Sequence, residues 1–128
     1  MNEIAAKLSG QGFIVCEKSG PDEEHFGNWF LVCTRCNVAV RITSDRGHVD
    51  LDLVPEALYK AGGGESDWYN WDVVARALSI PAEIDPLGSL PEYLQELDAA
   101  FAPGSWERTR DRLLLVEEEK RLERGIPM

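Results

Sequence analysis

The 128-residue chain carries 13 basic and 23 acidic side chains, which give it a formal net charge of −10. A negative field of this size repels phosphate backbones, so we expect no direct binding of nucleic acid. The same field attracts a basic protein and speeds its encounter with the chain. No run approaches the ~20 apolar residues that a membrane span needs, so a membrane protein is not expected.

The composition is that of a folded, globular chain. Apolar residues make up 44% of it and charged residues 28%, a balance that is unlike that of disordered proteins. The start, MNEIAAKLSGQGF, lacks the long apolar segment of a secretory signal, and the three cysteines are an odd number that fits a reducing compartment. Together these features predict a cytoplasmic protein.

The first part of the chain predicts a helix and then a sheet. Residues 2–10 form a short helical pattern that ends at two glycines, residues 13–18 (FIVCEK) read as a strand, and residues 19–27 read as a polar loop. Three further runs, NWFLVCT, VAVRIT and HVDLDLV, have the alternation of strands and are separated by the turns TRCN and SDRG. We therefore expect an antiparallel meander of about four strands.

Pairing the last two strands around a four-residue turn at Ser44–Gly47 separates apolar from polar positions. Arg41 then lies opposite Asp50, and Val40 lies opposite Leu51, so that one face of the sheet is apolar and the other polar. The same alternation, carried back through the first turn, places Cys33 on the apolar face.

The chain becomes helical after Pro55. A loop with room for one helical turn is followed by a helix at 70–79 with Asn70 as N-cap, and then by a helix at 89–102 with Ser89 and Glu92 at the spacing of a capping box. A final helix begins at about Ser105 and ends at Gly125.

The predicted fold class is therefore α+β. We expect an N-terminal helix, an antiparallel β-meander of about four strands, and three helices packed on one face of the sheet. The chain is expected to form one domain over residues 1–128, with a sheet-rich part at 13–54 and a helical part at 70–124, because the apolar face of the meander needs the helices to cover it.

The pair Cys33 and Cys36 has the spacing of a zinc knuckle. A structural zinc site needs four ligands, and the sequence contains no second close pair of cysteines or histidines. The meander places Cys33 in the core and Cys36 in a turn, so two unpaired structural cysteines are the main prediction. A redox pair is disfavoured because it requires a helix N-terminus.

His48, Asp50 and Asp52 alternate along one predicted strand. A histidine and two carboxylates on one face can hold a divalent metal and support metal-assisted hydrolysis. Positions along a straight strand are about 6–7 Å apart, which is too spread for one ion unless other ligands help. A solvent-facing strand, with Arg41 paired to Asp50, is the simpler interpretation.

The segment SDWYNWD, residues 66–72, concentrates aromatic and acidic side chains before a helix. Trp and Tyr are enriched where proteins bind proteins, although they can also anchor the helix to the sheet. The chain contains no phosphate-binding loop and no Gly-x-Ser-x-Gly motif, and it has only two histidines. We therefore expect a protein that is not an enzyme and needs no cofactor.

Two stretches, HFGNWFLVCTRCNVAVRITSDRGHVDLDL and DWYNWDVVARAL, resemble a pattern in small uncharacterised bacterial proteins. Some of those proteins look like immunity proteins of polymorphic toxin systems, which are cytoplasmic inhibitors that bind a toxin domain. The resemblance covers residues 25–78, and its most specific residues are Asp45-Arg46-Gly47 and Trp68-Tyr69. It does not include the Cys-x-x-Cys turn or the proline-rich C-terminal third.

The leading hypothesis is thus an acidic protein-binding module, such as an immunity-type inhibitor of a basic partner. The residues expected to contact that partner are Trp68, Tyr69, Asp67, Asp50, Asp52 and Glu65. The alternative is a zinc module or metal-dependent hydrolase that uses Cys33, Cys36 and His48 with the two strand aspartates.

Overall fold

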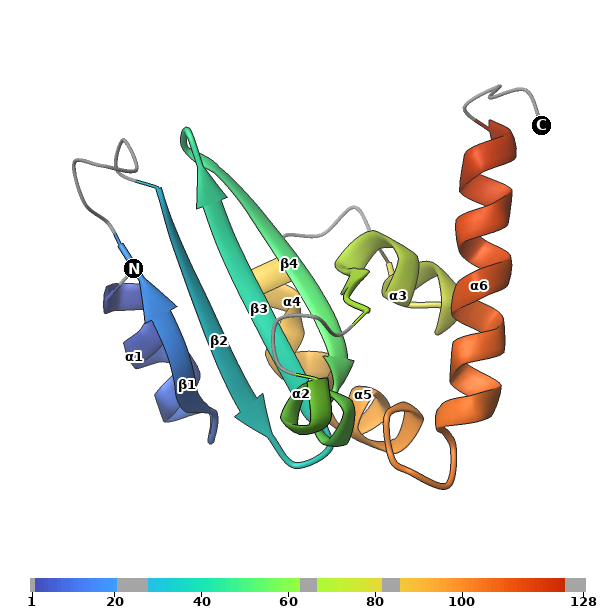
Figure 1. Ribbon diagram of the computed structural model, residues 1–128, viewed down its shortest axis with the longest axis horizontal. Coiled ribbons are helices and arrows are strands. Elements are labelled where there is room, and N and C mark those ends of the chain that lie inside the picture. The colour runs from blue at the N-terminus through green and yellow to red at the C-terminus, as the bar shows by residue number, and fades with distance from the viewer. Residues whose placement is uncertain (1, 21–27, 63–66, 82–85, 124–128) are drawn as a thin grey trace.

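The chain forms a helix, then a meander of strands, then a series of helices (Figure 1). The computed structural model describes residues 2–20, 28–62, 67–81 and 86–123. Its elements are α1 (Asn2–Gly10), β1 (Ile14–Ser19), β2 (Trp29–Arg35), β3 (Val38–Asp45), β4 (His48–Pro55), α2 (Glu56–Gly62), β5 (Tyr69–Asn70), α3 (Trp71–Ala77), α4 (Pro86–Ser89), the 3₁₀ helix η3 (Leu90–Tyr93), α5 (Leu94–Ala100) and α6 (Trp106–Glu123).

The strands form one antiparallel sheet in the order β1-β2-β3-β4-β5. The α+β class is therefore confirmed. The sheet has one strand more than expected, because the two-residue β5 pairs with the end of β4. Helix α2 replaces most of the loop expected after Pro55.

The sheet has an inner and an outer face. The inner face packs against the C-terminal helices and forms the main core, which includes Leu31, Val40 and Ile42 from the sheet, Val74 from α3, Leu97 from α5 and Leu113 from α6. The outer face carries a smaller cluster, made of Val32, Ala39 and Val54 from the sheet with Tyr59 of α2 and Trp68. Helix α2 therefore covers part of the face opposite to the other helices.

The predicted register of the second hairpin is wrong by two residues. The turn consists of Arg46 and Gly47 alone, with φ of 53° and 83°, and Asp45 pairs with His48. Arg41 consequently lies opposite Asp52 instead of Asp50. A shift by an even number of residues keeps every side chain on its face, so the predicted apolar and polar faces of this hairpin are confirmed.

The first hairpin also turns in two residues instead of four. Arg35 pairs with Val38, and Cys36 adopts a φ of 52° in the turn. Cys33 is fully buried in the main core, whereas Cys36 is exposed. The prediction of one core cysteine and one turn cysteine is confirmed.

The helix expected at 89–102 is broken into three pieces, namely α4, η3 and α5. Pro91 has no backbone N–H and fits only a first turn, which here is the turn of the 3₁₀ helix. Helix α5 begins after Tyr93, which makes no side-chain capping hydrogen bond. The α-helix therefore begins at Leu94 and not after Ser89, which is the last residue of α4.

The other two C-terminal helices follow the sequence prediction. Asn70 is the N-cap of α3, and its side chain accepts a hydrogen bond from the backbone N–H of Asp72 at 3.0 Å. Helix α6 buries Leu113 and Val116, and its Thr109 hydroxyl donates a hydrogen bond to the carbonyl of Ala100 at 2.6 Å. Across the described ranges, no helix combines the length and apolar character that crossing a membrane requires.

Candidate functional site

The side chains of residues 67–70 contribute to two candidate surfaces, one on each side of this segment. Side chains of an extended chain alternate between faces, and here Trp68 and Asn70 lie toward the outer face of the sheet, where each contacts a residue of that face. Asp67 and Tyr69 instead line a groove between α2 and α6. The aromatic segment therefore supplies a different pair of residues to each surface.

The first surface is a hollow of about 430 Å³ on the outer face of the sheet. We call it the outer hollow, and its lining residues are Glu17, Phe30, Val32, Arg41, Thr43 and Trp68. Its centre is apolar, because Val32 is buried there and Phe30 remains 36% exposed. Its rim carries both a carboxylate and a guanidinium group.

Arg41 is held on the outer face by two contacts. Its Nη2 atom donates a hydrogen bond to Oδ2 of Asp52 at 3.1 Å, and its guanidinium lies 4.7 Å from the centroid of the Trp68 ring. This ion pair is the cross-strand pair expected from the sequence, but with Asp52 in the place of Asp50. Stacking on an aromatic ring and pairing with a carboxylate fix the orientation of the guanidinium plane.

Two hydrogen-bond donors at the outer hollow are buried without an acceptor among the residues that the structure describes. Arg41 Nε and Trp68 Nε1 are both buried, and neither has a hydrogen-bond partner within the described residues. An unpaired buried donor destabilises a fold by roughly 1–3 kcal/mol. The presence of two unpaired donors beside the outer hollow favours a functional role for this hollow over a purely structural one.

Glu17 reaches the outer hollow because of a β-bulge in β1. Val15 pairs with Cys33 on the inner side, and the register then shifts so that Glu17 pairs with Val32. Without the extra residue at Cys16, alternation would turn Glu17 to the other face. The Tyr59 hydroxyl donates a hydrogen bond to the carboxylate of Glu17, and burial, followed by this bond and the charge of Glu17, raises the pKa of Tyr59.

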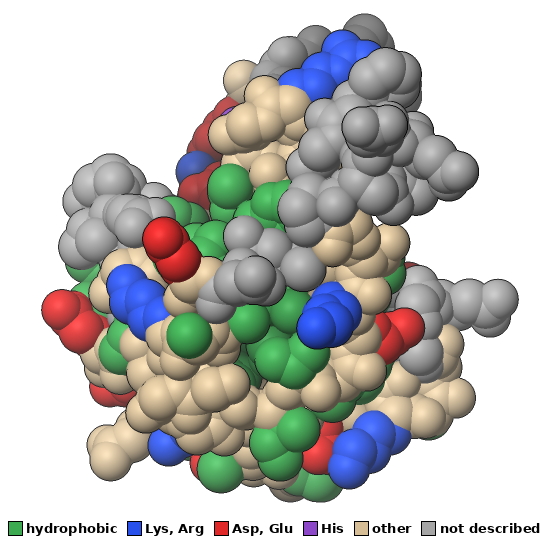
Figure 2. All heavy atoms as spheres, turned by 90° about the vertical axis from the view of Figure 1, so that its left-hand side faces the viewer, with side chains coloured by type: hydrophobic (Ala, Val, Ile, Leu, Met, Phe, Trp, Pro, Cys, Tyr) green, Lys and Arg blue, Asp and Glu red, His purple; other side chains and the backbone are tan. Residues whose placement is uncertain are grey.

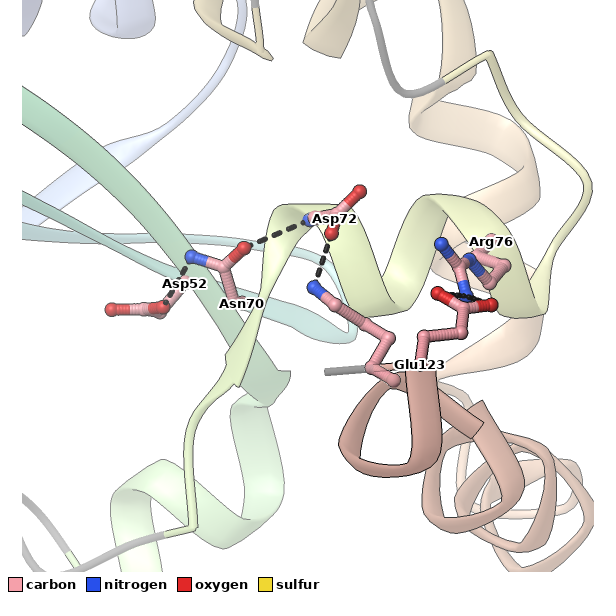
Figure 3. A network of polar contacts seen from close by, with 6 residues as sticks. Asp52, Asn70, Asp72, Arg76 and Glu123 are labelled. Carbon is pink, nitrogen blue, oxygen red and sulfur yellow. Dashed lines mark hydrogen bonds and ion pairs between the residues drawn. The ribbon is translucent and has the colours of Figure 1, made fainter. Parts of the chain in front are cut away.

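A network of polar contacts connects the outer face with α3 and α6 (Figure 3). The side-chain Nδ2 of Asn70 donates to Oδ1 of Asp52 at 3.4 Å, and the side-chain Oδ1 of Asn70 accepts from the backbone N–H of Asp72. Lys120 of α6 pairs with the Asp72 carboxylate. In the next turn of α3, Arg76 pairs with Glu123 of α6 at 3.1 Å, so that α3 is attached to α6 at both of its ends.

The second surface is the groove between α2 and α6, with a volume of about 700 Å³. Tyr69, 7% exposed, lies in it with its ring edge-on to Trp106 at 6.0 Å between centroids. Burial raises the pKa of Tyr69, and the nearby charges of Glu117 and Asp67 add to this effect, while Arg110 opposes it. The lining residues of this α2–α6 groove are Leu58, Ala61, Gly62, Asp67, Tyr69, Trp106, Glu107, Arg110 and Leu114.

The structure does not unite the six residues expected to contact a partner. Trp68 lines the outer hollow, and Asp52 pairs with Arg41 of the same hollow. Asp50 is farther along the same face, where its carboxylate lies 3.3 Å from His48 Nε2. Asp67 and Tyr69 belong to the α2–α6 groove, and Glu65 lies outside the described residues. Phe30 and Glu17 also line the outer hollow but are not among the six expected residues, and the place of Glu17 depends on the bulge in β1.

The side of the molecule that carries α1 and β1 has a mixed character (Figure 2). Hydrophobic side chains there lie among separate acidic and basic ones, and the exposed hydrophobic residues of β1 are Ile14 and Val15. Neither sign of charge dominates this side, so we do not place an acidic partner-binding surface on it.

The residues of the alternative metal hypothesis are not brought together. Cys33 is buried on the inner face, Cys36 is exposed in the first turn, and His48 is exposed beside the second turn. Burial, and to a smaller extent the nearby Cys16, raises the pKa of the Cys33 thiol to about 11, which opposes the thiolate form that binds metals. Among the described residues, no group of three or more His, Cys, Asp or Glu side chains has the geometry to hold a metal ion.

Comparisons with protein-family models, with curated proteins and with solved structures give no significant match. The functional interpretation therefore depends on the two surfaces themselves. The outer hollow offers an apolar centre with an aromatic side chain, a fixed guanidinium and a carboxylate. These are the components of a surface that binds another protein.

Proposed function

We propose that this chain is a protein-binding module that recognises a basic partner through the outer face of its sheet. The biological role we propose is that of an immunity-type inhibitor in the cytoplasm, which binds a toxin domain. The observation that carries the proposal is the outer hollow, where the exposed edge of Phe30 and the ring of Trp68 lie beside the carboxylate of Glu17.

The outer hollow has the anatomy of a binding hot spot. Hot spots are centred on aromatic and arginine side chains that already lie in well-packed surroundings. Trp68 is packed against Tyr59, with ring centroids 5.8 Å apart, and is covered by Arg41 on the sheet side. Because these side chains are already ordered, a partner that binds them loses little additional side-chain entropy.

The charge of the chain supports a basic partner. The formal net charge is −10. Two exposed carboxylates lie on the outer face: Glu17 lines the outer hollow, and Asp50 is on β4, which pairs with β3. Charges at the rim of an interface change mainly the association rate and its dependence on salt. Association with the partner should therefore slow as the salt concentration rises.

Affinity capture followed by reconstitution tests the proposal. The protein captured on the immobilised chain is purified, and its binding to matched single variants is measured by titration calorimetry. Phe30→Ala, at the outer hollow, should weaken binding at least tenfold, which is the loss of more than about 1.4 kcal/mol typical of a hot-spot residue. The control is Leu114→Ala in the α2–α6 groove, since Leu114 and Phe30 have similar exposures of 45% and 36%.

The two variants also separate the two candidate surfaces. If Leu114→Ala weakens binding and Phe30→Ala does not, the interface is the α2–α6 groove and the proposal for the outer face is wrong. If neither variant changes the affinity, or if the association rate is the same in low and high salt, an acidic interface centred on this chain's aromatic segment is refuted.

A further inference from the structure

The α2–α6 groove is separate from the outer hollow, and the two share no lining residue. Its volume of about 700 Å³ falls within the range of roughly 300–1,000 Å³ that is usual for small-molecule sites. An exposed leucine lies on each wall, Leu58 on α2 and Leu114 on α6, and the α2 wall continues with the small residues Ala61 and Gly62. The groove therefore has room for the apolar body of a small ligand.

The aromatic surface of the groove is ordered by its neighbours. Trp106, Arg110 and Leu114 follow one another at intervals of four residues, so they lie along one face of α6. The ring of Trp106 is edge-on to Tyr69 at 6.0 Å between centroids and to Phe101 at 5.6 Å. Because two rings hold Trp106 in place, a ligand that binds against it loses little additional side-chain entropy.

Tyr69 brings to the groove a hydroxyl group with no partner in the described part of the chain. The residue is only 7% exposed, and its hydroxyl makes no hydrogen bond to any described residue. Tyr59 is buried to the same degree, at 8% exposed, but its hydroxyl donates to Glu17. Since a buried tyrosine hydroxyl usually finds a partner, the unpaired hydroxyl of Tyr69 indicates a place for a polar group of a ligand.

Acidic side chains outnumber basic ones around this hydroxyl. Asp67 and Glu107 line the groove with a single base, Arg110, and neither carboxylate makes an ion pair within the described residues. Burial raises the pKa of Tyr69, and the charges of Glu117 and Asp67 raise it further, whereas Arg110 has the smallest effect and the opposite sign. The potential at the hydroxyl is therefore negative, which favours a cation over an anion.

We propose that the α2–α6 groove binds a small organic cation, namely a free molecule in which a protonated amine is attached to an apolar body. The body lies between the two leucine walls and against Trp106. The ammonium group donates a hydrogen bond to the hydroxyl of Tyr69 and is close to the carboxylates of Asp67 and Glu107. Hydrogen bonds from a charged donor are roughly twice as strong as neutral ones, and aromatic faces also attract cations.

Three probes that share a phenethyl body test the preference for positive charge. Phenethylammonium is a cation, phenethyl alcohol is neutral and phenylpropionate is an anion. Each is titrated into the purified full chain at neutral pH and physiological ionic strength, up to roughly 20 mM because ligands with few atoms bind weakly. The ammonium should bind at least fivefold more tightly than the alcohol, and the carboxylate should bind most weakly. Absence of ammonium binding, or equal binding of the three probes, would overturn the proposal.

The indole N–H signals in proton–nitrogen correlation spectra show where the ammonium binds. The signals of Trp106 and Trp68 are assigned by their loss in the variants Trp106→Phe and Trp68→Phe. The Trp106 signal should move most during the titration. The outer hollow also combines aromatic rings with a carboxylate, so a larger movement of Trp68 than of Trp106 would place the cation there and overturn the proposal for the groove.

Variants of the groove separate the effect of charge from that of shape. Asp67→Asn with Glu107→Gln should weaken phenethylammonium at least fivefold and leave the affinity for phenethyl alcohol within about twofold, which also shows that the groove is intact. Tyr69→Phe keeps the ring and should weaken the ammonium severalfold, because the hydrogen bond is lost. Arg110→Gln removes a like charge and should tighten the ammonium roughly two- to fivefold.

A matched control tests whether the net charge of the chain alone explains the effect. Glu3→Gln with Glu96→Gln makes the same change of net charge on exposed residues of α1 and α5, and it should leave the affinity for the ammonium within about twofold. A loss in this control as large as in the groove variant would overturn the proposal. Wild-type affinity in the variant that lacks both groove carboxylates would overturn it as well. Neither result would affect the proposed binding of a protein at the outer hollow, which has no lining residue in common with the groove.

Discussion

The thiol of Cys33 should make the fold less stable in mildly alkaline solution. Burial, with a smaller contribution from Cys16, raises its pKa in the folded protein from an ordinary value of 9.0 to about 11. In the unfolded chain the thiol loses its proton near the ordinary pKa, whereas the folded protein retains it. Above pH 9 the unfolded state therefore binds fewer protons than the folded state, and the free energy of unfolding falls as the pH rises.

The magnitude follows from the two pKa values. At pH 10 the unfolded thiol is mostly ionised and the folded thiol mostly protonated, which corresponds to about 1.4 kcal/mol of lost stability. The stabilising contribution is fully present well below pH 9 and is lost as the pH rises through 11, with a total loss of roughly 2.7 kcal/mol above both pKa values. The pKa of Tyr59 and that of Tyr69 are also raised, and these phenols add to the loss only near and above pH 10.

Urea unfolding at 25 °C between pH 8 and pH 10 measures this effect, with Cys33→Val as the comparison variant. The variant has its own stability at pH 8, because the core around residue 33 is fully buried, but its stability should decline less with pH than that of the wild type. The difference between the two declines should approach about 1.4 kcal/mol at pH 10. Parallel declines would refute the assignment of a buried, protonated thiol at this position.

Three further substitutions test the contacts that hold the site in place. Asn70→Ala should lower the free energy of unfolding by about 1 kcal/mol because the N-cap of α3 is lost, and Asn70→Ser should restore most of it in the same urea titration. Arg41→Met and Asp52→Asn, measured singly and together, should show a coupling energy of about 1 kcal/mol in a double-mutant cycle, since their partly buried ion pair also stacks on a ring. Thr109→Val should lower the thermal midpoint by several degrees, equivalent to about 1–2 kcal/mol, because it leaves the carbonyl of Ala100 without its hydrogen bond.

The faces of the sheet could be predicted from the sequence, but the register could not. The alternation of apolar and polar residues depends only on the parity of the pairing, and a shift by two residues preserves it. The exact pairing depends on the turn, and a two-residue turn here requires Arg46 to adopt a positive φ. Asn, Asp or Gly would have indicated such a turn, whereas arginine does not.

The candidate site could be predicted only in part for a related reason. Trp68 could be recognised from the local concentration of aromatic residues, but the partition of Trp68 and Tyr69 between two surfaces depends on how β5 pairs with β4. Glu17 joins the outer hollow because of the bulge at Cys16. No local pattern in β1 indicates a bulge, since its cause lies in the pairing with β2.

The connection between the outer face and α6 raises the question of whether binding at one would change the other. The contacts from Asp52 through Asn70 and Asp72 to Lys120 form a continuous path (Figure 3). Coupling between sites requires an element with two alternative arrangements, and physical proximity alone is insufficient. Each link of this path is a cap or an ion pair that is already made.

We therefore expect changes in α6 to leave binding at the outer face unaltered. Lys120→Gln, which removes the ion pair with Asp72, should bind the basic partner as tightly as the wild type, within about twofold, when both are measured by titration calorimetry. A change of tenfold or more would show about 1.4 kcal/mol of coupling. It would mean that α3, which is attached to α6 by Asp72 and Arg76, has a second arrangement available to it.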